Sequence, residues 1–350
     1  MKPIADRIQK YNRSRRSDFV QLKYKALTEN AYRFFRGTAH IFYEDFSKHP
    51  ALLKTPSTWL CGDLHLENFG SYKSANRLIY FDINDFDEAY FGPCAFDVTR
   101  LLVSIIISCR EVGIREKELR KLCSRFMNDY FTELGQGHAS RIEYAISSGI
   151  IKTYFDHLSS RKRDAFIRKR VSRVKGKLKL KIDKVKYFEL SSKEYRRVEE
   201  AVKQWVKANK QDAGFFRIHD IAYRVAGTGS LGLDRYAVLV SGKGYPKNYI
   251  LDVKEAVASS VQTYFPKKKL QFENDADRIV AVQKRMQDSS VAYLSSLSVE
   301  KKWFVIREHQ PSEDKMDLHA LSRNTKYLGN YIEHTAQLLA WAQIRSSGYR

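Results

Sequence analysis

The sequence lacks an apolar run long enough to cross a membrane, and it lacks paired cysteines. Its longest apolar stretch, residues 101–109, is far shorter than the roughly 20 residues of a membrane-spanning helix. Residues 1–16 are charged throughout and contain no apolar segment of the kind that a secretory signal needs. The four cysteines form no CxxC pair and have no zinc-like spacing, which predicts reduced thiols. We therefore expect no membrane span and a cytoplasmic location.

Acidic residues are scarce relative to basic ones. Asp and Glu number 40 against 62 Lys and Arg, which gives a formal net charge of +22. Such a charge attracts nucleic acid, anionic membrane surfaces or phosphorylated small molecules, and it does not by itself choose among them. The length of 350 residues and the hydrophobic fraction of 43% predict one large or two modest domains with a buried core.

The pattern of apolar residues predicts a mixture of helices and strands. Helices are expected within residues 1–50 and at 98–112, 115–134, 191–207, 275–287 and 327–345. Strands are expected near residue 58 and at 77–83, 175–181, 218–225, 236–240, 249–253 and 303–307. We expect an α+β fold in which the β-rich part follows the helical part.

An acid and an amide stand five residues apart in Gly62-Asp63-Leu64-His65-Leu66-Glu67-Asn68. This is the spacing between the catalytic acid and the metal-binding amide of a phosphoryl-transfer loop. Asp63 is therefore expected to reach a substrate hydroxyl and Asn68 to hold Mg²⁺. Because Mg²⁺ needs several oxygen ligands, Asp85 is expected to join Asn68, and Asp87 or Asp82 could supply or replace that ligand. The alternative is that these acids are ordinary turn and cap residues.

Two further polar residues belong to the same region. His65 is a catalytic candidate beside Asp63, although hydrogen bonding that orders the loop is favoured over metal ligation, because no second His or Cys lies at ligand spacing. Asp97 stands where the N-cap of the helix 98–112 is expected. It could instead brace the backbone amides of the loop around Asp63.

A glycine-rich segment, Gly227-Thr228-Gly229-Ser230-Leu231-Gly232, matches GxGxxG. Two unrelated nucleotide-binding folds use this motif. A β-rich run lies on each side of it, which favours a strand–loop–strand hairpin whose backbone amides hold phosphates. Gly227, Thr228, Gly229, Ser230 and Gly232 are thus candidate nucleotide-binding residues. Asp252 keeps a dinucleotide site open as an alternative, since it could bind ribose, and an ordinary tight hairpin is the simplest one.

One lysine follows the hairpin on the next predicted strand. Lys254 resembles the strand lysine that holds the α and β phosphates in kinases. A surface lysine is the alternative in so basic a chain. The helix 275–287 should carry the acidic partner of Lys254, yet it offers Gln283 and no Glu.

The segments around Asp63, Asp85-Phe86-Asp87-Glu88-Ala89 and Gly92-Pro93-Cys94-Ala95-Phe96-Asp97 resemble the active-site half of aminoglycoside phosphotransferase-like kinases. More closely, the whole chain is similar to the bacterial domain-of-unknown-function family 2252, with Phe34-Phe35-Arg36-Gly37 and Val253-Lys254-Glu255-Ala256 in the same order. The resemblance implies a protein kinase-like two-lobed fold that binds ATP with Mg²⁺.

The order of the two halves is the reverse of that in an ordinary kinase. The catalytic half, residues 55–135, precedes the nucleotide-clamp half, residues 215–310, which a circular permutation explains without new chemistry. We expect a catalytic helical lobe at 1–157, a basic connecting segment at 158–207, a β-rich nucleotide-clamp lobe at 208–310 and a C-terminal helix at 311–350 that packs back on the catalytic lobe.

These expectations lead to an ATP- and Mg²⁺-dependent phosphotransferase whose acceptor stays open, with anionic acceptors among the candidates. Two alternatives remain. A pseudokinase would bind nucleotide and act through a partner. A nucleic-acid-binding protein would use residues 161–186, where 13 basic residues accompany two acids, although a solvated basic surface is the more frequent reason for such a cluster.

Overall fold

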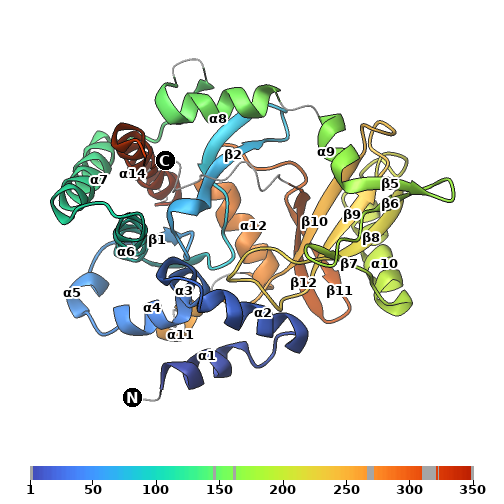
Figure 1. Ribbon diagram of the computed structural model, residues 1–350, viewed down its shortest axis with the longest axis horizontal. Helices are drawn as coiled ribbons and strands as arrows, with labels where there is room; N and C mark the ends of the chain where they lie inside the picture. The colour runs from blue at the N-terminus through green and yellow to red at the C-terminus, as the bar shows by residue number, and fades with distance from the viewer. Residues whose placement is uncertain are drawn as a thin grey trace.

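The computed structural model describes residues 3–144, 147–160, 163–265, 272–309, 321 and 323–347. Figure 1 shows the helices formed by the first and last parts of the chain on one side and a large sheet on the other, with helix α12 between them. The α+β class is as the sequence predicts. Within these ranges, we find no helix with the length and apolar character that crossing a membrane would require.

The helical side contains the predicted N-terminal helices and the long helices of the catalytic half. Because their apolar residues recur every three to four positions, these helices bury one face, except the short helix Pro50–Leu53, which has no buried residue. The helices of the first half are α1 (Ile4–Asn12), α2 (Ser17–Leu27), α3 (Ala31–Gly37), α4 (Ala39–Phe46), α5 (Pro50–Leu53), α6 (Ala95–Glu111), α7 (Glu116–Gln136) and α8 (Gly149–Ser160). The C-terminal helix α14 (Thr325–Ser346) packs against α7, and both contribute to the largest hydrophobic core.

Two short antiparallel strand pairs lie among these helices and carry the acidic motifs. Strand β1 (Ser57–Leu60) pairs with β4 (Tyr90–Pro93), and β2 (Phe69–Lys73) pairs with β3 (Ile79–Ile83). A single 3₁₀ turn, η1 (Leu66–Asn68), leads into β2. The loops that follow β1 and β3 therefore start from paired strands, which fixes the place of Asp63 and Asp85.

The largest sheet is antiparallel, with the strand order β11-β12-β10-β9-β8-β7. Its strands are β7 (Tyr187–Phe188), β8 (Ile218–Arg224), β9 (Arg235–Val240), β10 (Tyr249–Glu255), β11 (Ser295–Val299) and β12 (Lys302–Glu308). Between β10 and β11 the chain forms α11 (Ser260–Tyr264) and α12 (Asp275–Met286), and α12 packs on β11 and β12. In Figure 1 the sheet lies on the opposite side of α12 from strand β1.

The segment expected to connect two lobes covers both faces of this sheet. Helix α9 (Arg163–Arg170) and the hairpin of β5 (Val171–Val174) and β6 (Lys177–Leu180) bury Leu178 and Leu180 against one face. Helix α10 (Ser192–Ala208) buries Val202 and Trp205 against the other. The expected boundary between residues 310 and 311 lies outside the described residues.

One expected helix cap is wrong. Helix α6 begins at Ala95, and Cys94 occupies the N-cap position without a side-chain cap hydrogen bond. Asp97 lies within the first turn, where its carboxylate accepts hydrogen bonds from the backbone amides of Cys61 and Gly62. The structure therefore shows the second expected role of Asp97, which is to brace the loop. Without its carboxylate, these two buried amides would lack a hydrogen-bond acceptor.

Candidate functional site

One cavity, with a volume of about 470 Å³, brings the predicted site residues together. Ten of the eleven line it, and Gly232 is the exception. The cavity is highly charged, with eight basic and five acidic side chains in its wall. Its residues come from the N-terminal helices and their connections, from the loops after β1 and β3, from the loop between β8 and β9, from the face of the six-stranded sheet and from the C-terminal part of α12.

Asp63 lies in the loop after β1. The preceding residue, Gly62, has a backbone conformation and a close contact that only glycine allows. Gly62 has a φ of +91°, and a Cβ there would meet the carbonyl oxygen of Glu88 at 2.2 Å. The loop is further fixed by Asp97, which accepts hydrogen bonds from the amides of Cys61 (2.9 Å) and Gly62 (3.1 Å). Burial raises the pKa of Asp97 to about 7, although the two amides oppose that rise.

The carboxylate of Asp63 faces a buried arginine. Arg100 Nε donates to Asp63 Oδ1 at 2.6 Å, and the guanidinium also donates to the carbonyl oxygen of Phe35. Burial raises the pKa of Asp63, and the charge of Arg100 acts in the opposite direction. The carboxylate is thus oriented by an ion pair while its burial favours proton uptake, and a proton acceptor needs both properties.

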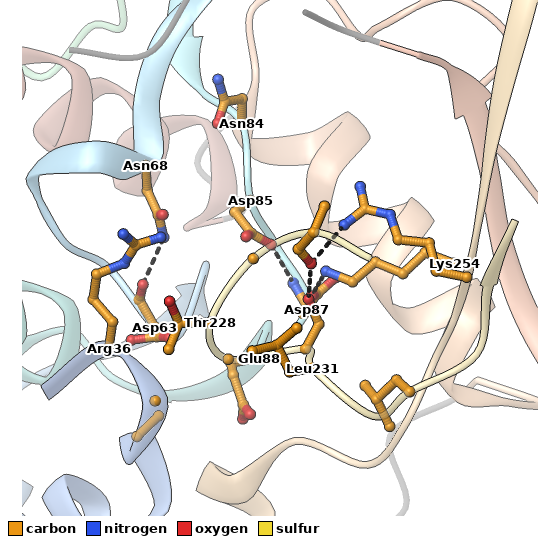
Figure 2. A pocket seen from close by; sticks show the side chains of 18 of the residues that line it. Arg36, Asp63, Asn68, Asn84, Asp85, Asp87, Glu88, Thr228, Leu231 and Lys254 are labelled. Atoms are coloured by element: carbon orange, nitrogen blue, oxygen red, sulfur yellow. Dashed lines mark hydrogen bonds and ion pairs between the residues drawn. The ribbon is translucent and has the colours of Figure 1, made fainter. Parts of the chain in front are cut away.

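Asn68 is tied to the same loop. Its side-chain amide donates to the carbonyl oxygen of Asp63 at 2.6 Å (Figure 2). This bond uses the nitrogen of the amide, so its oxygen is the atom suited to a cation. The carbonyl oxygen of Asn68 accepts from the amide of Asn84, the first residue after β3.

His65 is buried between the acid and the amide and contacts neighbouring side chains. Its Nε2 accepts a hydrogen bond from Arg36 Nε at 3.1 Å, and its ring lies edge-on to Tyr32. Arg36 also forms an ion pair with Glu67. His65 therefore takes part in ordering the loop and in holding Arg36 at the cavity wall.

Asp85 and Asp87 follow the end of β3 and both line the cavity, whereas Asp82 does not. Asp82 is buried elsewhere and accepts a hydrogen bond from the amide of Asp288. In the described part of the chain, no three His, Cys, Asp or Glu side chains gather closely enough to form a metal site by themselves. The side chains of Asn68 and Asp85 offer the kind of oxygen that holds Mg²⁺ at sites where waters and substrate phosphates supply the remaining ligands.

The glycine-rich loop joins β8 to β9 and lies over Asp63. Gly227 and Gly232 have φ values of +79° and +86°, which disfavour other residues. A Cβ on Gly229 would lie 3.9 Å from Asp63 Oδ2 and 3.5 Å from the carbonyl oxygen of Arg36. The loop and the acidic motif, far apart in the sequence, thus meet at one side of the cavity.

The N-terminal segment holds this loop in place. The guanidinium of Arg15 donates to the carbonyl oxygens of Gly229 (2.7 Å) and Leu231 (2.8 Å), and Lys23 donates to that of Gly229 at 3.1 Å. Lys23 is buried, and burial together with the charge of Arg15 lowers its pKa well below the usual range. Both side chains line the cavity, and neither belongs to a motif that is recognisable in the sequence.

The acidic partner of Lys254 lies in the loop after β3. Lys254 forms an ion pair with Asp87, as Figure 2 shows. The sequence predicts this partner on helix α12. That helix offers Gln283 instead, whose side chain is hydrogen-bonded to Gln287. The lysine of the sheet and the loop after β3 are therefore linked directly across the cavity.

Asp252 is not available for a ribose. It is buried and bonded to Arg224 (2.6 Å) and, through two bonds, to Arg235 (2.7 and 2.5 Å). Although burial acts to raise the pKa of Asp252, the arginines hold it well below the usual range. The glycine-rich loop is followed by a strand of an antiparallel sheet, whereas a dinucleotide site needs a helix there. The dinucleotide alternative is therefore wrong.

Several cavity residues lay outside the sequence predictions. Arg100, which is bonded to Asp63 but is not among the residues that line the cavity, had a recognisable signal, because it is a lone charge in the apolar stretch of α6. Arg36 lies in the quoted segment Phe34-Phe35-Arg36-Gly37. For Arg15 and Lys23 there was no signal, since they stand in a basic leader among many similar residues.

Residues 15–350 match the model of a family described as "Uncharacterized protein conserved in bacteria (DUF2252)". No curated protein and no solved structure matches the chain.

Proposed function

The chain belongs to the DUF2252 family, and we propose that it is an ATP- and Mg²⁺-dependent phosphotransferase with a kinase-like fold in permuted order. One observation carries the proposal. The glycine-rich loop and Lys254 of the sheet line the same cavity as Asp63, Asn68 and Asp85. These are the kinds of residue that hold phosphates, orient the acceptor and bind the metal in phosphoryl transfer.

The arrangement within the sheet supports this proposal. The glycine-rich loop joins two adjacent antiparallel strands, β8 and β9, and Lys254 lies on the next strand, β10. Helix α12 then follows β10 and packs against the sheet. A glycine loop, a lysine on the third strand and a helix behind it are the phosphate-holding parts of protein kinases, in the same order.

The position of the C-terminal helix supports the permutation. The end of α14 lies beside the start of β1, where the hydroxyls of Thr58 and Ser346 are 2.8 Å apart. Joining these two places would put the glycine loop, Lys254 and α12 before Asp63, which is the usual kinase order. The end of α14 and the start of β1 are thus close enough for the short connection that such a permutation requires.

In this proposal Asp63 accepts the proton of the attacking hydroxyl, and its raised pKa suits that role. Asn68 and Asp85 would hold Mg²⁺, which neutralises charge on the phosphates when it is bound. Lys254 and the amides of the glycine loop would hold the phosphates themselves. Positioning and charge neutralisation provide most of the catalysis in this class of reaction.

A nucleotide-binding protein without transfer activity is the second candidate, and the Lys254–Asp87 pair favours it. This pair uses both the lysine expected on the phosphates and one of the candidate metal ligands. Helix α12 carries no Glu that could take over the lysine. If Asp87 keeps Lys254 when nucleotide is present, binding would proceed without an assembled catalytic site.

The nucleic-acid alternative gains no comparable support. Of the apolar residues that stand between the basic ones, Leu178, Leu180 and Tyr187 are buried in the core against the six-stranded sheet, and Phe166 packs against that core and is partly buried. The three buried side chains are therefore not available to contact bases. Residues 161 and 162 of the basic segment lie outside the described residues.

A combined binding and transfer assay tests the proposal. Thermal stabilisation by ATP with Mg²⁺ and release or transfer of labelled γ-phosphate are measured for the parent chain and for Asp63→Asn, Asp85→Ala and Lys254→Ala. The phosphotransferase is supported if the parent chain shows both signals and each variant loses at least one. Stabilisation without turnover selects the nucleotide-binding candidate, and no response of the parent chain rejects both.

A further inference from the structure

Five charged side chains share the cavity face of the six-stranded sheet. Asp252 and Lys254 are two residues apart on β10 and so lie on the same face. The antiparallel ladder places Arg307 of β12 opposite Asp252, and Arg235 of β9 opposite Lys254. Arg224, at the end of β8, reaches Asp252 with a hydrogen bond. All five line the cavity.

The charges in this group do not balance. Lys254 is paired with Asp87, whereas Arg224, Arg235 and Arg307 surround the single carboxylate of Asp252. Three guanidinium groups thus share one carboxylate as their direct partner, with the charge of Asp85 also acting on Arg235, at a place where the side chains of Arg224 and Arg235 are only 11% exposed. Charges withdrawn from water are costly unless a counter-charge accompanies them.

The three guanidinium groups also have N–H donors that make no hydrogen bond to the described residues. Each has five N–H donors in a planar fork. Among the described residues Arg224 donates one bond, Arg235 three and Arg307 one. A phosphate or carboxylate oxygen pair accepts such forks in parallel, and these bonds are stronger than neutral ones.

The same face is unsuited to an aromatic base. A slot for a base is lined mainly by apolar side chains, and here the strand positions beside Lys254 carry arginine and aspartate. We propose that Arg224, Arg235 and Arg307 form an anion subsite that binds a phosphate group of the substrate. The proposal rests on the proposed function for the view that this cavity binds phosphorylated substrates, and the phosphate would come from an anionic acceptor or from the donor itself.

Isothermal titration with pyrophosphate tests the subsite. The variant is Arg307→Gln, because the Arg307 side chain is 21% exposed and its loss leaves Asp252 bonded to the other two arginines. The matched control is Arg77→Gln, which also removes one arginine but lies outside the cavity, paired with Glu308. Unfolding midpoints without ligand show whether each variant is folded.

We expect Arg307→Gln to weaken pyrophosphate binding by about tenfold or more, because a charge-assisted contact is lost. Arg77→Gln should leave the affinity within about twofold, since the overall charge alone has only a screened effect. Arg307→Lys, which keeps the charge but loses the fork, should fall between the parent chain and Arg307→Gln. Absence of pyrophosphate binding by the parent chain, or equal weakening in Arg307→Gln and Arg77→Gln, would overturn the subsite.

Titration in saturating ATP with Mg²⁺ identifies the source of the phosphate. Pyrophosphate binding that persists beside the nucleotide supports the subsite as that of the acceptor, whereas competition supports it as part of the donor site. The two proposals fail separately. If pyrophosphate binding depends on Arg307 but the chain neither binds nor turns over ATP, only the proposed function is rejected. If the chain turns over ATP but does not bind pyrophosphate in this way, only the subsite is rejected.

Discussion

Lys254 on β10 and Asp87 after β3 form an ion pair between positions 167 residues apart. The pair joins the six-stranded sheet to the strand pair that carries the acidic motif, and it crosses the cavity. The Lys254 side chain is 10% exposed and that of Asp87 35%, so solvent screens the pair only in part. The same lysine is the proposed phosphate ligand. Mutation of the pair can therefore separate its contribution to stability from the contribution of Lys254 to nucleotide binding.

Exchanging the charges of Lys254 and Asp87 should separate the structural role of the ion pair from the role of Lys254 in binding. Lys254→Asp and Asp87→Lys should each lower the free energy of unfolding by about 1 kcal/mol or more, because each single change places like charges together. The double variant should recover most of that loss in urea unfolding, since the pair is rebuilt in reverse. It should still not be stabilised by ATP with Mg²⁺, because an acid then faces the phosphates. Recovery of nucleotide binding in the double variant would show that Lys254 is not a phosphate ligand.

Asp63→Asn should reduce phosphoryl transfer by at least about 10²-fold, the usual contribution of a positioned proton acceptor. Nucleotide binding should remain, because the phosphate-holding residues are unchanged. Labelled γ-phosphate transfer and thermal stabilisation by ATP with Mg²⁺ measure the two effects. Asp45→Asn is the control, since this exposed aspartate is paired with nearby Lys48 and does not line the cavity. Equal activity of both variants would contradict the assigned role.

Asp97 should give the protein a pH-dependent stability. Its pKa is raised from 3.8 to about 7 in the folded chain, so the folded state binds the proton more tightly than the unfolded state. The contribution of Asp97 to stability is therefore greatest below about pH 4 and is lost as the pH rises from 4 to 7. Asp97→Asn should flatten this part of the profile in urea unfolding measured from pH 4.5 to 7.5. An unchanged slope would mean that Asp97 is ionised in the folded protein.

Gly62→Ala should destabilise the loop that carries Asp63 far more than Gly113→Ala destabilises the turn after α6. Both residues have a positive φ, +91° and +76°, so both variants incur the left-handed backbone cost of about 1–2 kcal/mol. Only at Gly62 would the new Cβ collide with backbone, at 2.2 Å from the Glu88 carbonyl oxygen. The difference between the two unfolding free energies should exceed about 1 kcal/mol. Equal losses would show that the loop can move away from Glu88.

Arg15→Ala should loosen the glycine-rich loop, because it removes two hydrogen bonds to the carbonyl oxygens of Gly229 and Leu231. Amides of residues 226–233 should exchange with solvent about tenfold faster, as expected when about 1.4 kcal/mol of local stabilisation is lost. Hydrogen exchange followed by mass spectrometry measures this. Arg13→Ala, at an exposed position of the same segment, should leave the exchange unchanged. Faster exchange in both variants would point to a general effect of charge.

The helices and strands near the site followed largely from local patterns. The alternation of apolar residues in 236–240 and 249–253 predicted β9 and β10, and the apolar stretch after Pro93 predicted α6. Strand β11 was missed, since Ser295-Ser296-Leu297-Ser298-Val299 has little apolar pattern. Such a strand is held by its ladder to β12, and a ladder partner is not visible in a single segment.

Local sequence patterns predicted the residues of the candidate site: Asp63 and Asn68 at their spacing, the acids after β3, the glycine-rich segment and Lys254. These motifs are visible in the sequence because each lies within a few residues of one loop or strand. How the motifs combine depends on the tertiary structure. It brought Asp87 to Lys254, set Arg15 on the glycine-rich loop and gathered three arginines around Asp252. These contacts join distant segments through strand register and packing, and their charges are compensated or left in excess only once the chain has folded.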